Sequence, residues 1–147
     1  MSEHYVEGPV EAARRAFLEL GQDDWLRMLA DLRRIFLGAR DYAGAHGGDG
    51  RIVFVSAAAA ARPIAGAALE GVAGAFLTTA AQVASVELAE RGVTANVVVP
   101  ALEPDEQAVQ AVVEFLLADS AHGITGAVIV ADGGFSITKS SESSPLV

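Results

Sequence analysis

Residues 68–100, ALEGVAGAFLTTAAQVASVELAERG followed by VTANVVVP, decide the fold. The first part carries no charge over residues 71–86 and predicts a helix, with Gly92 placed where a left-handed C-terminal cap is expected. The second part is a valine-rich run typical of a buried strand, and Pro100 ends it. Residues 51–56, RIVFVS, predict another buried strand before the helix. This strand–helix–strand order indicates parallel strands joined by right-handed crossovers.

The same pattern extends on both sides of this unit. A helix is predicted over about residues 24–45, another over 103–121, and a third strand over 126–131, GAVIVA. Acidic residues begin both helices, where capping and the helix dipole explain them better than catalysis does; they are Asp23, Asp24, Glu103, Asp105 and Glu106. The fold class is therefore α/β, with about three parallel strands and flanking helices. The predicted organisation is an N-terminal helical extension (1–22, with a helix over Pro9–Leu20), an α/β domain (23–137) and a flexible tail (138–147).

Composition limits the classes of function. The chain has 147 residues, is 52% apolar and carries a formal net charge of −9, which disfavours nucleic acids and anionic membrane surfaces as partners. The absence of cysteine excludes disulfides and thiol chemistry. No signal-peptide pattern is present and the longest charge-free run is too short to span a membrane, so we expect a cytoplasmic protein. The three histidines are scattered, which predicts no metal site.

Four segments resemble the C-terminal half of the short-chain dehydrogenase/reductase family, close to its ketoacyl reductases. They are DDWLRMLADLRRIFL (23–37), GRIVFVSA (50–57), ELAERGVTANVVVPA (87–101) and FLLADSAHGITGAVIVADGGFSI (115–137). The resemblance implies a partial Rossmann-like three-layer fold and, in intact members, hydride transfer between NAD or NADP and a carbonyl. It also implies that the chain is a truncated, degenerate member without the family's first four strands. RIVFV would then be an unpaired sheet edge that needs a partner.

The resemblance carries no catalytic residue over to this chain. The family's helix asparagine falls on Asp31, its serine on Ala57, its tyrosine on Glu70 and its lysine on Gly74. Whatever the alignment, Lys139 is the chain's single lysine and no tyrosine stands four residues before it. No glycine-rich turn follows a strand near the start, so we predict no catalytic residue, no cofactor-binding residue and no cofactor.

A helix that is apolar all round should be covered all round, and a small domain covers only one face. In the resembling family the two corresponding helices pack against a neighbouring subunit as a four-helix bundle, and the last strand and helix form a second interface. The predicted oligomer interface comprises Leu29, Phe36, Leu37, Gly74, Phe76, Leu77 and Ala81.

Three functional hypotheses follow. The preferred one is a non-catalytic (pseudoenzyme) subunit that associates with an intact short-chain reductase and stabilises or modulates the assembly. The first alternative is a self-associating homo-oligomer that binds a small apolar or acyl ligand at the vestigial cleft without redox chemistry. The second is an enzyme with new acid chemistry at Glu70 or Asp31.

Overall fold

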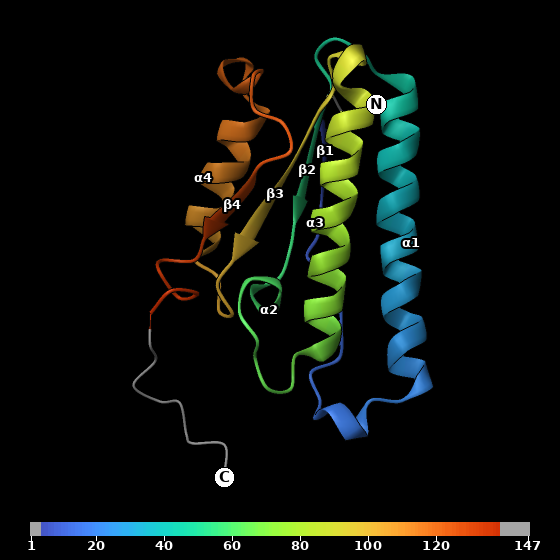
Figure 1. The fold of residues 1–147 in the computed structure, drawn as a ribbon, viewed down its shortest axis with the longest axis vertical. Coiled ribbons are helices and arrows are strands. Elements are labelled where there is room, and N and C mark those ends of the chain that lie inside the picture. The colour runs from blue at the N-terminus through green and yellow to red at the C-terminus, as the bar shows by residue number, and fades with distance from the viewer. Residues whose placement is uncertain (1–3, 139–147) are drawn as a thin grey trace.

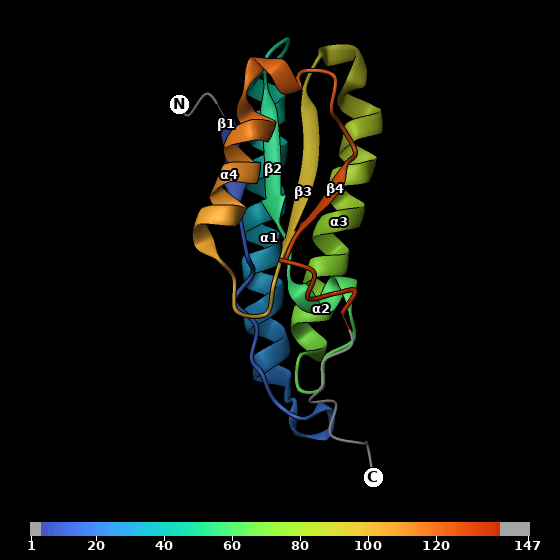
Figure 2. The same ribbon diagram turned by 90° about the vertical axis from the view of Figure 1, so that its left-hand side faces the viewer.

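The fold is a single parallel sheet between two layers of helices, and the computed structural model describes it over residues 4–138. The sheet has the order β1-β2-β3-β4. Its strands are β1 (His4–Glu7), β2 (Arg51–Val55), β3 (Thr94–Pro100) and β4 (Val128–Ala131). The α-helices are α1 (Gln22–Ala45), α2 (Ala58–Ala61), α3 (Ala68–Leu88) and α4 (Glu106–Leu117). Short 3-10 helices are η1 (Phe17–Glu19), η2 (Ala89–Arg91) and η3 (Asp119–Ala121). Figures 1 and 2 show α1 and α3 on one face of the sheet and α4 on the other.

The predicted α/β class with a parallel sheet is confirmed, and β1 adds a fourth strand to the three that the sequence indicated. It pairs with β2 in parallel from His4 opposite Arg51 to Glu7 opposite Phe54, so RIVFV is an inner strand and not an unpaired edge. The four residues HYVE are too short and too polar to predict a strand by themselves. They form one because β2 offers a complete row of backbone hydrogen-bonding groups.

The prediction of an N-terminal helical extension is also wrong. Of the helix expected over Pro9–Leu20, only the 3-10 turn η1 forms, and β1 makes the first residues part of the same sheet as the rest. Val10 is buried in the core and the backbone N–H of Glu11 donates to Asp31 Oδ2 at 3.2 Å, which holds the segment extended against α1. Residues 139–147 of the expected tail lie outside the described residues.

The crossovers differ in hand. The strands advance in one direction across the sheet, yet α1 and α3 lie behind it and α4 in front of it in Figure 2. The connections through α1 and α3 are right-handed as expected, whereas β3–α4–β4 is left-handed, an exception to a rule that holds for about 98% of such units. The reason is that α3 already covers the rear face beside β3, so α4 buries its apolar side on the opposite face.

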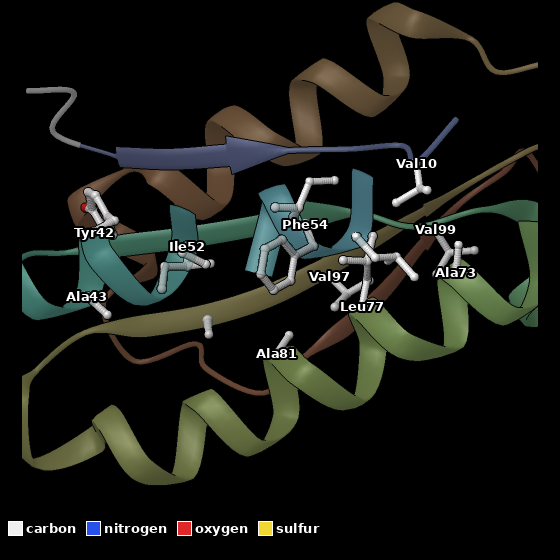
Figure 3. Packing of buried hydrophobic residues seen from close by; sticks show 14 of the residues in the cluster. Val10, Tyr42, Ala43, Ile52, Phe54, Ala73, Leu77, Ala81, Val97 and Val99 are labelled. Carbon is white, nitrogen blue, oxygen red and sulfur yellow. The ribbon is translucent and has the colours of Figure 1, made fainter. Parts of the chain in front are cut away.

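Every residue of β2 and β3 is buried, because both faces of these central strands are covered. On the rear face, Ile52 and Phe54 of β2 and Val97 of β3 share one core cluster with Leu77 and Ala81 of α3 (Figure 3). On the front face, Val53, Val55 and Val98 pack against α4 through Val113 and Leu116.

Helix ends follow the predicted chemistry. The backbone N–H of Gly21 donates to Asp24 Oδ2 at 3.0 Å, and Asp105 Oδ1 accepts from the N–H groups of Gln107 and Ala108. Gly92 has φ 73°, the left-handed conformation predicted for it, and leads the chain from η2 into β3.

Helix α3 is apolar on all sides, and only one side is covered. Ala73, Leu77 and Ala81 face the sheet and are buried, whereas Val72 and Phe76 lie exposed on the outer side. By length and composition alone, Ala68–Arg91 is apolar enough to cross a membrane. Its packing along β2 and β3 is that of a core helix with one uncovered face.

We predict that Leu77→Ala lowers the free energy of unfolding by about 2–5 kcal/mol, because Leu77 is 1% exposed and its truncation leaves a cavity between α3 and the sheet. Val86→Ala on the same helix is the control: Val86 is 77% exposed and its loss should change stability by less than about 0.5 kcal/mol. Urea unfolding followed by circular dichroism measures both. Equal effects would mean that α3 does not rest on the sheet through Leu77.

Candidate functional site

The carboxyl ends of the parallel strands meet at one edge of the sheet, where α/β proteins bind their ligands. Ser56 and Ala57 follow β2, Ala101 follows β3 and Asp132 follows β4. Helix α2 and the turn after β4 lie at this edge (Figure 2). Arg62, just after α2, joins them: its Nη1 donates to the carbonyls of Phe135 at 2.9 Å and Thr138 at 3.0 Å.

The position onto which the resemblance places the catalytic lysine has no room for a side chain. A Cβ on Gly74 would lie 2.7 Å from both the Cβ of Ala60 and Oγ of Ser56, because α2 packs directly on α3 there. The Ser56 side chain is buried, and within residues 4–138 its hydroxyl has no hydrogen-bond partner. The neighbouring serine position is Ala57, which precedes the first turn of α2 and has no hydroxyl at all.

Glu70, at the tyrosine position, is held in an ion pair. It lies in the first turn of α3, and Arg14 Nε donates to its Oε1. The Glu70 side chain is 13% exposed and that of Arg14 is 54% exposed. Glu70 therefore attaches the segment around Arg14 to the first turn of α3.

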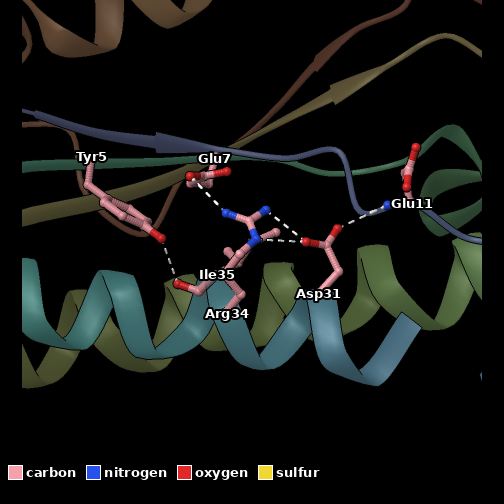
Figure 4. A network of polar contacts seen from close by, with 6 residues as sticks. All are labelled: Tyr5, Glu7, Glu11, Asp31, Arg34 and Ile35. Carbon is pink, nitrogen blue, oxygen red and sulfur yellow. Dashed lines mark hydrogen bonds and ion pairs between the residues drawn. The ribbon is translucent and has the colours of Figure 1, made fainter. Parts of the chain in front are cut away.

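Asp31, at the asparagine position, ties α1 to the first strand. Figure 4 shows Arg34 between two carboxylates, donating to Asp31 Oδ1 at 2.7 and 3.0 Å and to Glu7 Oε1 at 3.1 Å. These hydrogen bonds, to Asp31 first and then to Glu7, raise the pKa of Arg34 above its ordinary value. The remaining oxygen of Asp31 accepts the N–H of Glu11. Asp31 is therefore fully engaged in holding β1 and the following segment to α1.

Tyr5 of β1 reaches the backbone of α1 and the aromatic side chains beside it. Its hydroxyl donates to the carbonyl of Ile35 at 2.9 Å, and its ring packs against Tyr42 and Phe54. Burial, with the nearby charge of Glu7, raises the pKa of Tyr5. This phenol is protonated at neutral pH and serves to join β1 to α1.

Asp132 closes the turn after β4. Its carboxylate accepts the N–H groups of Gly134 at 2.9 Å and Ser136 at 2.8 Å. Hydrogen bonding by Ser136 lowers the pKa of Asp132, and the N–H of Gly134 adds to the effect. The sequence DGG (132–134) therefore forms a turn in which the Asp132 side chain binds the backbone N–H groups that follow it.

The most apolar hollow lies away from the strand ends, between α1 and α3. It measures about 610 Å³, within the usual range of ligand sites, and its walls are mainly small or apolar residues. The rings of Phe36 and Phe76 meet edge to face at 6.1 Å near one end, and Glu87 and Arg91 line the other.

The seven predicted interface residues divide into two groups. Leu29, Phe36 and Phe76 are 40–46% exposed on the outer side of the two helices, and Leu37 is half-buried. Gly74, Leu77 and Ala81 are buried within the chain, so they do not reach its surface. The helical repeat brings Gly74, Leu77 and Ala81 onto the side that faces the sheet, opposite the side that Phe76 occupies.

Sequence reasoning missed Arg14 and the segment around it. The adjacent arginines of EAARRAF were the available signal, because two cations opposite acidic helix starts are candidates for ion pairs. Within residues 4–138, no group of three or more histidine, aspartate or glutamate side chains is placed to hold a metal ion.

Gly74→Ala tests the closeness of α2 and α3. We expect it to lower the free energy of unfolding by about 1–3 kcal/mol, since the added methyl group overlaps Ala60 and Ser56. Gly44→Ala in α1 is the matched control, because its Cβ would meet nothing within 4 Å, and alanine should stabilise that helix by about 0.5–1 kcal/mol. Thermal and urea unfolding measure both. An unchanged free energy of unfolding in Gly74→Ala would show that α2 can shift away from α3 at little cost.

The Asp132 turn predicts a pH dependence. Because its pKa is lower in the folded chain, Asp132 stabilises the fold above its unfolded pKa of about 3.9, and this contribution is lost as the pH falls through the folded value. Asp132→Asn should therefore melt below the wild type at pH 7, and the difference should shrink on acidification. Asp49→Asn, in an exposed turn, is the control. A difference that stays constant with pH would contradict the assigned role.

Of the comparisons with known proteins, the one with solved structures gives matches. No family model matches the sequence, and no curated protein does. Among solved structures, a short-chain dehydrogenase/reductase from Serratia marcescens is 30% identical with a TM-score of 0.80, over 91% of this chain and 66% of its own. The angucycline C-6 ketoreductase LanV, solved with bound NADP, is 23% identical with a TM-score of 0.82, over 92% of this chain and 63% of its own.

An acetoin dehydrogenase from Enterobacter cloacae gives a TM-score of 0.81 at 19% identity, over 94% of this chain and 66% of its own. These matches include more of the chain than residues 23–137, on which the sequence resemblance rests. The chain thus spans about 63–66% of the length of these three structures. By its parallel sheet, its order of elements and its identity to the Serratia structure, the chain belongs to the short-chain dehydrogenase/reductase family.

Proposed function

We propose that this chain is a non-catalytic, cytoplasmic subunit that associates with an intact short-chain dehydrogenase/reductase and stabilises or modulates the assembly. The observation that carries the proposal is the packing at Gly74. Where the resemblance calls for a lysine, α2 lies so close to α3 that even a Cβ would overlap it.

The chemistry of the family explains why this position matters. Proton transfer to a carbonyl oxygen needs a donor whose pKa suits the task, and a phenol meets that need when a nearby ammonium lowers its pKa. Here the corresponding positions hold Glu70, which is paired with Arg14, and Gly74. The two tyrosines of the chain, Tyr5 and Tyr42, lie in β1 and α1, and neither precedes a lysine by four residues.

The outer side of α1 and α3 supports association. Leu29 and Phe36 of α1 and Phe76 and Val83 of α3 are each at least 40% exposed, along two helices that contact each other. Large apolar side chains gathered on one face of a soluble domain mark a binding surface. We assign this surface, the α1–α3 face, to the reductase subunit.

The groove on the same face favours a second candidate. This candidate is a homo-oligomer that buries the groove between two copies of the chain or holds a small apolar or acyl ligand in it. The groove lies between α1 and α3, whereas the sequence analysis expected the ligand at the ends of the strands. New acid chemistry has less support, because Glu70 and Asp31 each accept hydrogen bonds from an arginine.

We predict that this chain, tagged and isolated from its own cells, has a native mass that includes a larger subunit carrying a Tyr-x-x-x-Lys sequence in a fixed ratio. Placing a charge on the α1–α3 face by Phe36→Arg and Phe76→Arg together should remove that subunit, because two charges would then be buried without partners. Native mass spectrometry measures the composition.

Leu18→Arg is the control, since Leu18 is 95% exposed on η1, away from the α1–α3 face. A mass made only of copies of this chain would contradict the reductase subunit and favour the homo-oligomer. NADH oxidation by the purified chain alone would contradict both.

A further inference from the structure

Residues 9–21, which we call the strap, run from the end of β1 past the first turn of α3 to the start of α1. Figure 1 shows this segment in blue below the two helices. Val10 is the one fully buried residue of the strap. At its middle, in η1, Phe17 and Leu18 are 78% and 95% exposed. The strap reaches the core near its two ends, through Val10 and the partly buried Ala12 and Leu20, whereas residues 14–19 contribute no buried side chain.

Polar contacts hold the strap to the two helices, and each uses a carboxylate. Arg14 is paired with Glu70 of α3. Arg15 Nε lies 3.9 Å from Asp24 Oδ1 of α1, and the N–H of Glu11 donates to Asp31. Of the two ion pairs, the one between Arg14 and Glu70 has hydrogen-bonding geometry, and it is the one that connects the strap to α3.

Both ends of the strap are fixed more firmly than its middle. Gly8, just before it, has φ 108°, and a Cβ there would lie 2.2 Å from the carbonyl oxygen of Val55, so the backbones are in direct contact. At the other end, the N–H of Gly21 is capped by Asp24. A segment with fixed ends, few buried side chains and exposed polar contacts opens locally at a small cost in free energy.

We propose that the strap is a lid over the first turn of α3, latched by the ion pair between Arg14 and Glu70, that opens while the sheet and the long helices stay folded. In the closed state the Glu70 side chain is largely covered. Opening the strap exposes Glu70 and the turn before α3, where a Cβ on Gly66 would lie 4.0 Å from the carbonyl oxygen of Arg15. The lid thus controls access to Glu70 and to the turn before α3, whichever partner the chain has.

Hydrogen exchange measured by mass spectrometry on the full chain tests the proposal. In the wild type, amides 11–20 should exchange faster than those of α3 and β3. Their exchange should be faster still in 1 M salt, where the Debye length is about 3 Å, than in 0.01 M salt, where it is about 30 Å. Arg14→Gln should raise exchange in residues 11–20 about fivefold, the factor set by an ion pair of about 1 kcal/mol, and should reduce the salt effect there to what the Arg15–Asp24 pair contributes.

Arg40→Gln is the matched control. Arg40 is an exposed arginine of α1 that pairs with Asp41 at 2.7 Å, outside the strap, so its loss should leave residues 11–20 unchanged. The exchanged pair, Arg14→Glu with Glu70→Arg, should restore wild-type protection. Unchanged exchange in Arg14→Gln would overturn the latch. An equal rise in β3 and α3 would overturn the lid, since the strap would then open only with the whole fold.

Discussion

The close approach of α3 to the sheet and to α2 is the constraint on which the structure depends. It is possible because the inner side of α3 carries small residues, Ala73, Gly74 and Ala81, around Leu77. Glycine at position 74 allows α2 to lie directly on the helix, and Ile52 and Phe54 of β2 with the rear-facing valines of β3 fill the layer beneath. The packing that fixes α3 in place also removes the space in which a long side chain would reach the strand ends.

The sequence predicts the parts of the fold that depend on strong local patterns. The fully buried strands β2 and β3, the long helices and the glycine cap at Gly92 all follow from apolar periodicity and turn chemistry. Strand β1 could not be predicted in this way, because HYVE forms a strand only when β2 lies beside it. The left-handed crossover through α4 is likewise set by which face of the sheet is free.

The candidate site shows the same limit: residue identities follow from the sequence, whereas contacts between distant segments do not. The residues at positions 57, 70 and 74, which the resemblance gives to catalytic groups, could be read directly from the sequence. The contacts that these residues make could not be predicted. That Arg14 reaches Glu70 across 56 positions depends on an extended strap, and the expected helix over Pro9–Leu20 would have placed Arg14 elsewhere. The same limit explains Gly74 and Leu77, which were predicted at an interface and are buried inside the chain.

Two of these replacements now share a structural role. Asp31 and Glu70 stand at positions that the resemblance gives to catalytic groups, and each accepts hydrogen bonds that attach the N-terminal segment to a helix. Restoring a tyrosine at position 70 would therefore remove a contact of the strap, and a lysine at position 74 would require α2 to move. Because the two changes act on packing as well as on chemistry, substitution of single residues would not rebuild the family's acid–base pair. The role of a subunit is therefore proposed on the packing at Gly74 and on the exposed apolar side chains of the α1–α3 face.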